Sequence, residues 1–167
     1  MLKYQELSNT YQVIKVTEAQ LPAVLKLCES NPSFYKYCPP LASLESLKQD
    51  LIKLPKNMTM DDKCYLAYYK DNQLVAVLDL ITNYPSANVA FIAFFMLDKS
   101  FKGKGIGTAI INELELYLKA EGYLKIILAW VDGNNQSSNF WHKLGFKETG
   151  KYNDVDGYRM IFADKVL

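Results

Sequence analysis

The stretch of the sequence best suited to hold a ligand runs from Lys102 to Thr108 and reads Lys-Gly-Lys-Gly-Ile-Gly-Thr. Three glycines at alternate positions remove the side chains that would keep a ligand away from the backbone. The loop follows an apolar run, 89–97, and precedes an amphipathic helix predicted over 108–121. The N–H groups and dipole of a helix N-terminus favour an anion, and Lys102 and Lys104 add charge. The loop therefore predicts a phosphate or pyrophosphate site; a tight turn with solvated lysines is the alternative.

Two common nucleotide-binding motifs do not fit this loop. A Walker loop requires GxxxxGK(S/T), which is absent, and the dinucleotide fingerprint GxGxxG fails by one residue. Asp132, at the end of the next predicted strand, could imitate the ribose-binding acid of that fingerprint. However, residues 132–167 contain a predicted hairpin and cannot supply the further parallel strands of a Rossmann domain. A nucleotide-binding regulatory domain is therefore kept only as a rival interpretation.

A second patterned segment follows one predicted strand later and contains, in order, Asn134, Ser137, Phe140, Trp141, Lys143, Leu144, Gly145 and Phe146. Together the two segments resemble the GNAT family of N-acetyltransferases. The family's pyrophosphate loop, (Q/R)xxGx(G/A), is matched by Gly105 and Gly107, with Lys102 where Gln or Arg is usual. The second segment matches the family motif Nxx(A/S)xxΦYxKxGF, where Φ is apolar, except that Trp141 replaces the tyrosine. The resemblance covers residues 11–167.

The resemblance implies a specific fold, reaction and cofactor site. It implies the acyl-CoA N-acyltransferase fold and transfer of an acetyl group from acetyl-CoA, as co-substrate, to a primary amine in a ternary complex, with no metal. The strand backbone would run along the pantetheine, and one of its N–H groups would polarise the thioester carbonyl. The residues implied to contact acetyl-CoA are Phe95, Met96, Leu97, Lys102, Gly103, Lys104, Gly105, Ile106, Gly107, Thr108, Asn134, Ser137, Trp141 and Lys143.

The catalytic assignments are Trp141 and Asp79. Most relatives carry a tyrosine at the position of Trp141, and an indole N–H donates a hydrogen bond but cannot act as an acid at useful pH. Trp141 is therefore expected to pack against and position the thiol. The strand 89–97 lacks the glutamate that some relatives use as general base, so Asp79, within Val-Ala-Val-Leu-Asp-Leu-Ile, is the candidate base unless it merely lies at a strand end. Without the usual tyrosine and glutamate, a non-catalytic acyl-CoA-binding or sensing module is the rival function.

Other polar residues are weaker candidates for the chemistry. His142 is adjacent to Trp141 but points about 100° away on a helix, so a solvated or packing role is favoured. Tyr152 or Tyr158 could reach the cleft from the last hairpin, and the sequence selects neither. On the acceptor side, Phe34, Tyr35 and Tyr37 form an aromatic rim suited to an apolar amine or a lysine stem. The alternative is that these rings pin their loop to the core.

Composition limits the classes of partner. The chain has 167 residues, a formal net charge of +1 and 50% hydrophobic residues, which favours one folded domain and argues against a disordered protein. Arg159 is the only arginine, so no global field or set of arginine forks favours nucleic acid. The longest apolar run is too short for a membrane helix, and three cysteines without a CxxC motif favour a reduced, cytoplasmic protein. The expected partner is a small-molecule or peptide amine, and a homodimer is compatible with the sequence.

The pattern of apolar residues predicts the elements that position these groups. After a short lead-in over 1–10, strands are predicted over 11–16, 64–70, 74–81, 89–97, 124–131, 146–152 and 157–163. Helices are predicted over 18–29, 43–54, 108–121 and 136–144, with a loop over 30–42. The strand–helix–strand crossover in the middle of the chain requires one parallel pair of strands. The predicted fold is α/β, with a mixed, mostly antiparallel sheet and helices on both sides.

Overall fold

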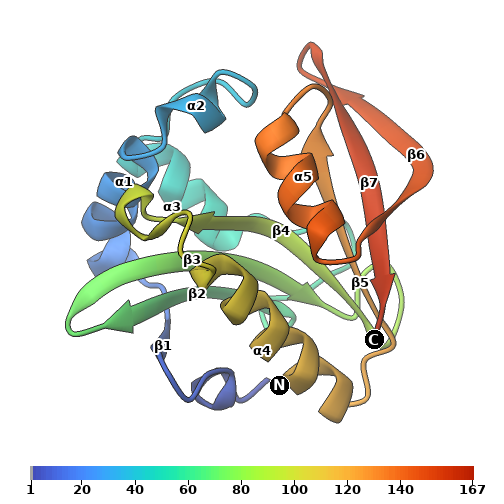
Figure 1. Cartoon of the computed structure of the whole chain (residues 1–167), viewed down its shortest axis with the longest axis horizontal. Helices are drawn as coiled ribbons and strands as arrows, with labels where there is room; N and C mark the ends of the chain where they lie inside the picture. Colours follow the sequence, from blue (N-terminus) through green and yellow to red (C-terminus); the bar gives the residue numbers. More distant parts are fainter. Residues whose placement is uncertain (1) are drawn as a thin grey trace.

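A seven-stranded sheet forms the centre of the computed structural model, which describes residues 2–167 (Figure 1). Its strand order is β1-β2-β3-β4-β5-β7-β6. Only the central pair, β4 with β5, is parallel. The mixed, mostly antiparallel sheet predicted from the sequence is confirmed. The strands are β1 (Gln12–Lys15), β2 (Lys63–Lys70), β3 (Gln73–Thr82), β4 (Val89–Leu97), β5 (Lys125–Val131), β6 (Lys147–Val155) and β7 (Tyr158–Val166).

Helices cover both faces of the sheet. On one face, the buried side of α1 (Leu21–Glu29) and Leu47 of α3 (Leu44–Ile52) pack against Tyr65, Ala67 and Val77. On the other face, α4 (Ile106–Ala120) and Trp141 of α5 (Asn135–Lys143) share a second core with Leu66 and Leu78. Neighbouring residues of β2 and β3 thus point into opposite cores, as alternation along a strand requires. No helix within residues 2–167 has the length and apolar character to cross a membrane.

The predicted helix starts are realised by side-chain caps. Thr17 and Gln20 form the expected capping box, although the first turn over Glu18–Gln20 is a 3-10 turn that leads into α1. Ser43 caps α3 in the same way, with Ser46 as the reciprocal partner.

Several boundaries differ from the prediction. A short helix, α2 (Pro32–Tyr35), interrupts the predicted loop 30–42. The last hairpin extends further than predicted at its C-terminal ends, to Val155 in β6 and Val166 in β7. The lead-in is not a loose tail, because Leu2 and Leu7 are buried in the core beneath α4.

The two parallel strands separate halfway along the sheet. β4 pairs with β5 only from Val89 to Ile92, whereas β5 continues beside β7 as far as Val131. The pairing of β3 with β4 shifts at the same level: Leu80 lies opposite Ile92 and Asp79 opposite Phe94, which leaves Ala93 as an extra residue in β4. A bulge of this kind bends its strand and increases its twist. The result is an opening between the second half of β4 and β5, here called the β4–β5 opening.

Candidate active site

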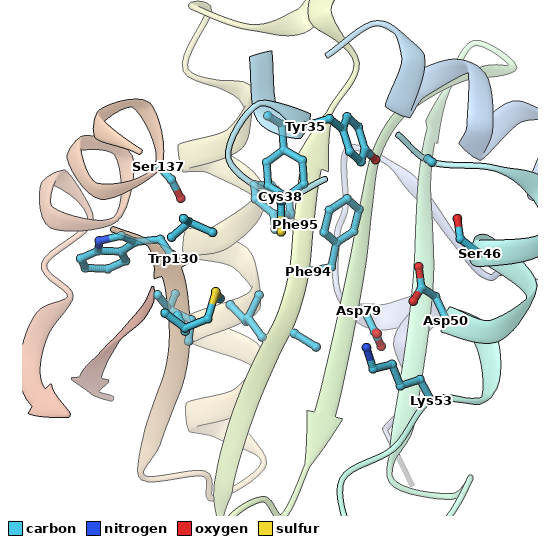
Figure 2. A pocket seen from close by; sticks show the side chains of 18 of the residues that line it. Tyr35, Cys38, Ser46, Asp50, Lys53, Asp79, Phe94, Phe95, Trp130 and Ser137 are labelled. Atoms are coloured by element: carbon cyan, nitrogen blue, oxygen red, sulfur yellow. The ribbon is translucent and has the colours of Figure 1, made fainter. Parts of the chain in front are cut away.

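Two clefts lie on opposite faces of the sheet and meet at the β4–β5 opening. The glycine-loop cleft, of about 350 Å³, lies beside the N-terminus of α4 and is lined by every predicted acetyl-CoA-contacting residue except Lys104. The aromatic cleft, of about 620 Å³, lies beneath α3 and the loop after α2 (Figure 2). Residues common to both clefts mark where they join: Phe34, Phe95, Asn134, Ser137 and Trp141.

The backbone of β4 offers unused polar groups at this junction. The Asp98 N–H donates to the Val75 carbonyl at 2.9 Å, so Asp98 is hydrogen-bonded to β3. In an antiparallel pair, every second residue of a strand has its N–H and C=O groups directed at the partner strand. The N–H and C=O groups of Leu97 and Phe95 therefore point away from β3. β5 has already diverged there, and Asn31 Nδ2 donates to the Leu97 carbonyl at 2.9 Å. The remaining groups, including the N–H of Phe95 and of Leu97, can pair with an extended amide-containing ligand. The same alternation directs the N–H and C=O groups of Met96 toward β3. Met96 therefore lines the cleft, but its backbone cannot form hydrogen bonds with the ligand.

The glycine loop supplies the other half of this binding surface. Gly103 and Gly105 have φ values of +74° and +75°, in the left-handed region that glycine adopts without strain. Gly105 is the N-cap residue of α4, and no side chain caps this helix. The N–H groups of the first turn therefore remain available for an anion. Gly107 has a different role, because a Cβ there would lie 2.9 Å from Leu97 Cδ1.

The lysines around the loop are not equivalent. Lys102 and Lys143 line the glycine-loop cleft, and burial, together with neighbouring Lys99, lowers the pKa of Lys102. Lys104 does not line the cleft, and its ammonium donates to the Ser100 carbonyl at 2.9 Å. Of the two lysines predicted to add charge, Lys102 lines the cleft and Lys104 does not, and Lys143 is a second lysine that lines it.

Asn134, which the resemblance implies contacts acetyl-CoA, also caps a helix in the structure. Its Oδ1 accepts a hydrogen bond from Ser137 N–H at 3.1 Å and caps α5. Asn134 is buried and lines both clefts, and its side-chain hydrogen bond within residues 2–167 involves the oxygen and not the amide nitrogen. The cap thus orients the amide so that the NH₂ group is left as a donor at the junction.

Trp141 lies inside an aromatic cluster at the same junction. Its ring centroid lies 4.8 Å from that of Phe140, 5.2 Å from that of Phe146 and 6.0 Å from that of Phe95. Only 6% of its surface is exposed. The placement suits the packing and positioning role predicted for this residue. His142, its neighbour, lies outside both clefts, against the Trp130 ring and 3.5 Å from a Glu148 carboxylate oxygen.

The structure weakens the assignment of Asp79 as general base. Asp79 lies in the middle of β3, not at its end, and lines the aromatic cleft. Both of its carboxylate oxygens bind the buried Lys63 ammonium, at 2.8 and 3.0 Å. Burial raises the pKa of Asp79 and the Lys63 charge opposes that shift. Both oxygens of this carboxylate are bound to Lys63, so accepting a proton from the amine would require breaking a buried ion pair. That cost makes Asp79 a poor general base.

The aromatic rim is only partly as predicted. Phe34 and Tyr35 line the aromatic cleft, and Phe34 packs edge-on against Phe94 with centroids 5.7 Å apart. Tyr37 does not line either cleft and is 39% exposed. Tyr158 also lies outside both clefts, with its hydroxyl 3.8 Å from Cys38 Sγ, and burial contributes most to raising its pKa to about 12.

Asp50 is a cleft residue that the sequence interpretation missed. It lies on α3 and lines the aromatic cleft, where burial raises its pKa. The available signal was its position three residues after Leu47, on the side of the predicted helix that turns toward the core. An acid at such a position is unusual in an amphipathic helix, where charged residues usually lie on the solvent side.

Comparison with known proteins identifies the family. The model of the acetyltransferase (GNAT) family matches residues 27–146. A curated relative, an uncharacterized N-acetyltransferase of Methanocaldococcus jannaschii, is 39% identical over 69 residues, which cover 41% of this chain and 30% of that protein. The chain thus matches under a third of that relative's length.

Solved structures share the fold. An acetyltransferase of Thermus thermophilus superimposes with a TM-score of 0.77 and 19% identity, over 95% of this chain and 97% of that chain. The PaiA N-acetyltransferase of Thermoplasma acidophilum, solved in complex with coenzyme A, gives a TM-score of 0.66 and 23% identity over 94% and 99% of the two chains. At these identities the likeness extends to the fold.

Proposed function

Because the chain belongs to the acetyltransferase (GNAT) family, we propose that it transfers an acetyl group from acetyl-CoA to the primary amine of a small acceptor, by direct attack while both substrates are bound. The observation that carries this proposal is the meeting of two clefts from opposite faces of the sheet at Phe95, Asn134 and Trp141. One cleft has the anion-binding features of a CoA site, and the other is left for an acceptor.

The residues of the glycine-loop cleft have complementary tasks. The first-turn N–H groups of α4, with Lys102 and Lys143, would hold the pyrophosphate. The unpaired N–H groups of Phe95 and Leu97 would bind the pantetheine arm and polarise the carbonyl of the acyl group. Acetyl-CoA itself supplies an activated acyl group as a thioester. The Asn134 amide would add a donor near the reacting atoms, which suits charge that develops during attack.

In the proposed reaction, water and the substrates themselves accept the amine proton and protonate the CoA thiolate. The residues common to both clefts are apolar or uncharged, and within residues 2–167 none of them is a carboxylic acid, lysine or histidine. Trp141 cannot supply a proton. A thiol with an ordinary pKa near 8.5 leaves as a thiolate at a cost of about 2 kcal/mol at neutral pH, so unassisted departure is feasible.

A panel of amines tests the proposal. The protein is incubated with acetyl-CoA and primary amines of different classes, and the free CoA thiol and the acetylated amine are both quantified. We expect at least one amine class to yield acetylated product in a one-to-one ratio with released CoA. Binding of acetyl-CoA without any acetylated product across the panel would instead favour a non-catalytic acyl-CoA-binding module.

A further inference from the structure

The aromatic cleft contains a carboxylate that the protein itself does not pair. The charged residues that line the cleft are Asp50, Lys53 and Asp79. Asp79 is neutralised by Lys63, which binds both of its oxygens. Asp50 makes no hydrogen bond and no ion pair with any other residue in the range 2–167. Asp50 is therefore the acid in this cleft whose charge is available to a ligand.

The position of Asp50 directs that charge into the cleft. Leu47, one helical turn earlier on α3, is buried against the sheet, so Asp50 shares the inward side of the helix. Figure 2 shows its carboxylate pointing from α3 toward the strands. The side chain is half-buried, and burial raises the pKa of Asp50 while the charges of Lys53 and Lys63 oppose the shift. A half-buried carboxylate without a partner is costly, and a bound cation would remove that cost.

Lys53 does not serve as that cation. It is exposed at the mouth of the cleft, and no ion pair within 4 Å joins it to Asp50. In Figure 2 its side chain extends toward Asp79 instead. An exposed ammonium keeps its hydration and gains little from a surface pairing.

Aromatic rings line the same cleft as Asp50. Tyr65, Phe91 and Phe94 line it from the sheet, and Phe34 and Tyr35 from α2. Such rings pack well against methylene groups and attract ammonium groups through their faces. The volume of about 620 Å³ is in the range of small-molecule sites.

We propose that Asp50 binds a second ammonium group of the acceptor, so that the preferred acceptor is a small diamine with an apolar spacer. One nitrogen of the diamine would reach Asn134 and Trp141 at the junction, while the other would bind Asp50 on α3. This inference rests on the proposed acetyl transfer, and it specifies the acceptor class for the same site.

The test compares acceptors of equal chain length that differ at the far end. Linear α,ω-diamines, alkylamines and ω-amino acids are assayed for kcat/KM with the full-length protein. If Asp50 forms a charge-assisted hydrogen bond with the second ammonium group, kcat/KM for the best diamine should exceed that for the matched alkylamine by about 10- to 100-fold. Asp50→Asn should reduce that ratio to within about threefold of unity, and Asp50→Lys should favour the ω-amino acid instead.

Glu45→Gln is the matched control, because Glu45 lies on the same helix and is exposed outside both clefts. It should leave the ratio unchanged, and melting curves with and without acetyl-CoA confirm that each variant folds. Equal kcat/KM for diamines and alkylamines, a preference for ω-amino acids in the unaltered protein, or a ratio unaffected by Asp50→Asn would each overturn the inference while acetyl transfer stands. Failure to acetylate any amine would overturn the proposed function and the inference with it.

Discussion

Replacing Gly105 by valine should abolish CoA binding while the protein stays folded. Gly105 caps α4 with a φ of +75°, a conformation that a β-branched residue resists at a cost of about 1–2 kcal/mol. A Cβ at this position would meet no protein atom within 4 Å, so the protein core is not disturbed. The new side chain would instead occupy the space through which a phosphate approaches the first N–H groups of α4. Isothermal titration with CoA measures the loss, expected to exceed a hundredfold in Kd.

Gly150→Val provides the matched control for strain. Gly150 has a φ of +78°, also has nothing within 4 Å of a Cβ, and lies on β6 away from both clefts. This variant should lose similar stability but bind CoA normally. In thermal unfolding, acetyl-CoA at 100 times its Kd should stabilise the control by about 2.7 kcal/mol and leave Gly105→Val unchanged. Normal CoA binding by Gly105→Val would show that the pyrophosphate lies elsewhere.

Lys102 should matter less than the backbone beside it. It is half-buried at the edge of the cleft and contributes a point charge, whereas the N–H groups of α4 remain when its side chain is removed. In the same titration, Lys102→Ala is the comparison that separates side-chain charge from backbone donors.

At Trp141, replacement by phenylalanine should retain most of the activity, and replacement by alanine should remove most of it. The ring packs among Phe95, Phe140 and Phe146 at the junction of the clefts. Phenylalanine keeps much of that packing and loses a hydrogen bond worth about 1 kcal/mol. Alanine leaves a cavity, which should lower the free energy of unfolding by about 3–5 kcal/mol. The acyl group would also lose its fixed position, and a displacement of about 1 Å can lower the rate about a hundredfold.

A loss of turnover in these variants counts against the site only if the variant is folded and binds CoA. Melting temperature and the Kd for CoA are measured for each, and Trp141→Leu replaces the alanine variant if the latter does not fold. A phenylalanine variant as inactive as the alanine variant, with normal stability and CoA affinity, would show that the indole N–H itself is essential. The positioning role would then be wrong.

The sequence predicted the fold and most of the residues that line the glycine-loop cleft, because both depend on local signals. Continuous apolar runs defined the central strands, Thr17 and Ser43 capped helices, and the loop around Gly105 joins a buried strand to a helix start. These features are fixed by neighbours in the chain. Asn134 caps α5 through its own Oδ1 and the Ser137 N–H three residues later, which is also a contact between near neighbours in the chain.

The acceptor half was less predictable because its geometry depends on contacts between distant residues. Asp79 is paired with Lys63 across neighbouring strands, a contact that depends on the register of β2 with β3. The bulge at Ala93 opens β4 from β5, and no residue type in the apolar run 89–97 marks its place. Asp50 enters the cleft only because α3 lies across the sheet, so its role could not be read from its own segment.

Initial rates over a matrix of acetyl-CoA and amine concentrations test the central claim most directly. If the two substrates occupy the two clefts together and react at the β4–β5 opening, double-reciprocal plots should intersect, and acetylated amine should appear only when both substrates are present. Parallel lines with an acetyl group covalently bound to the protein would contradict this account, as would CoA release at a rate independent of the amine.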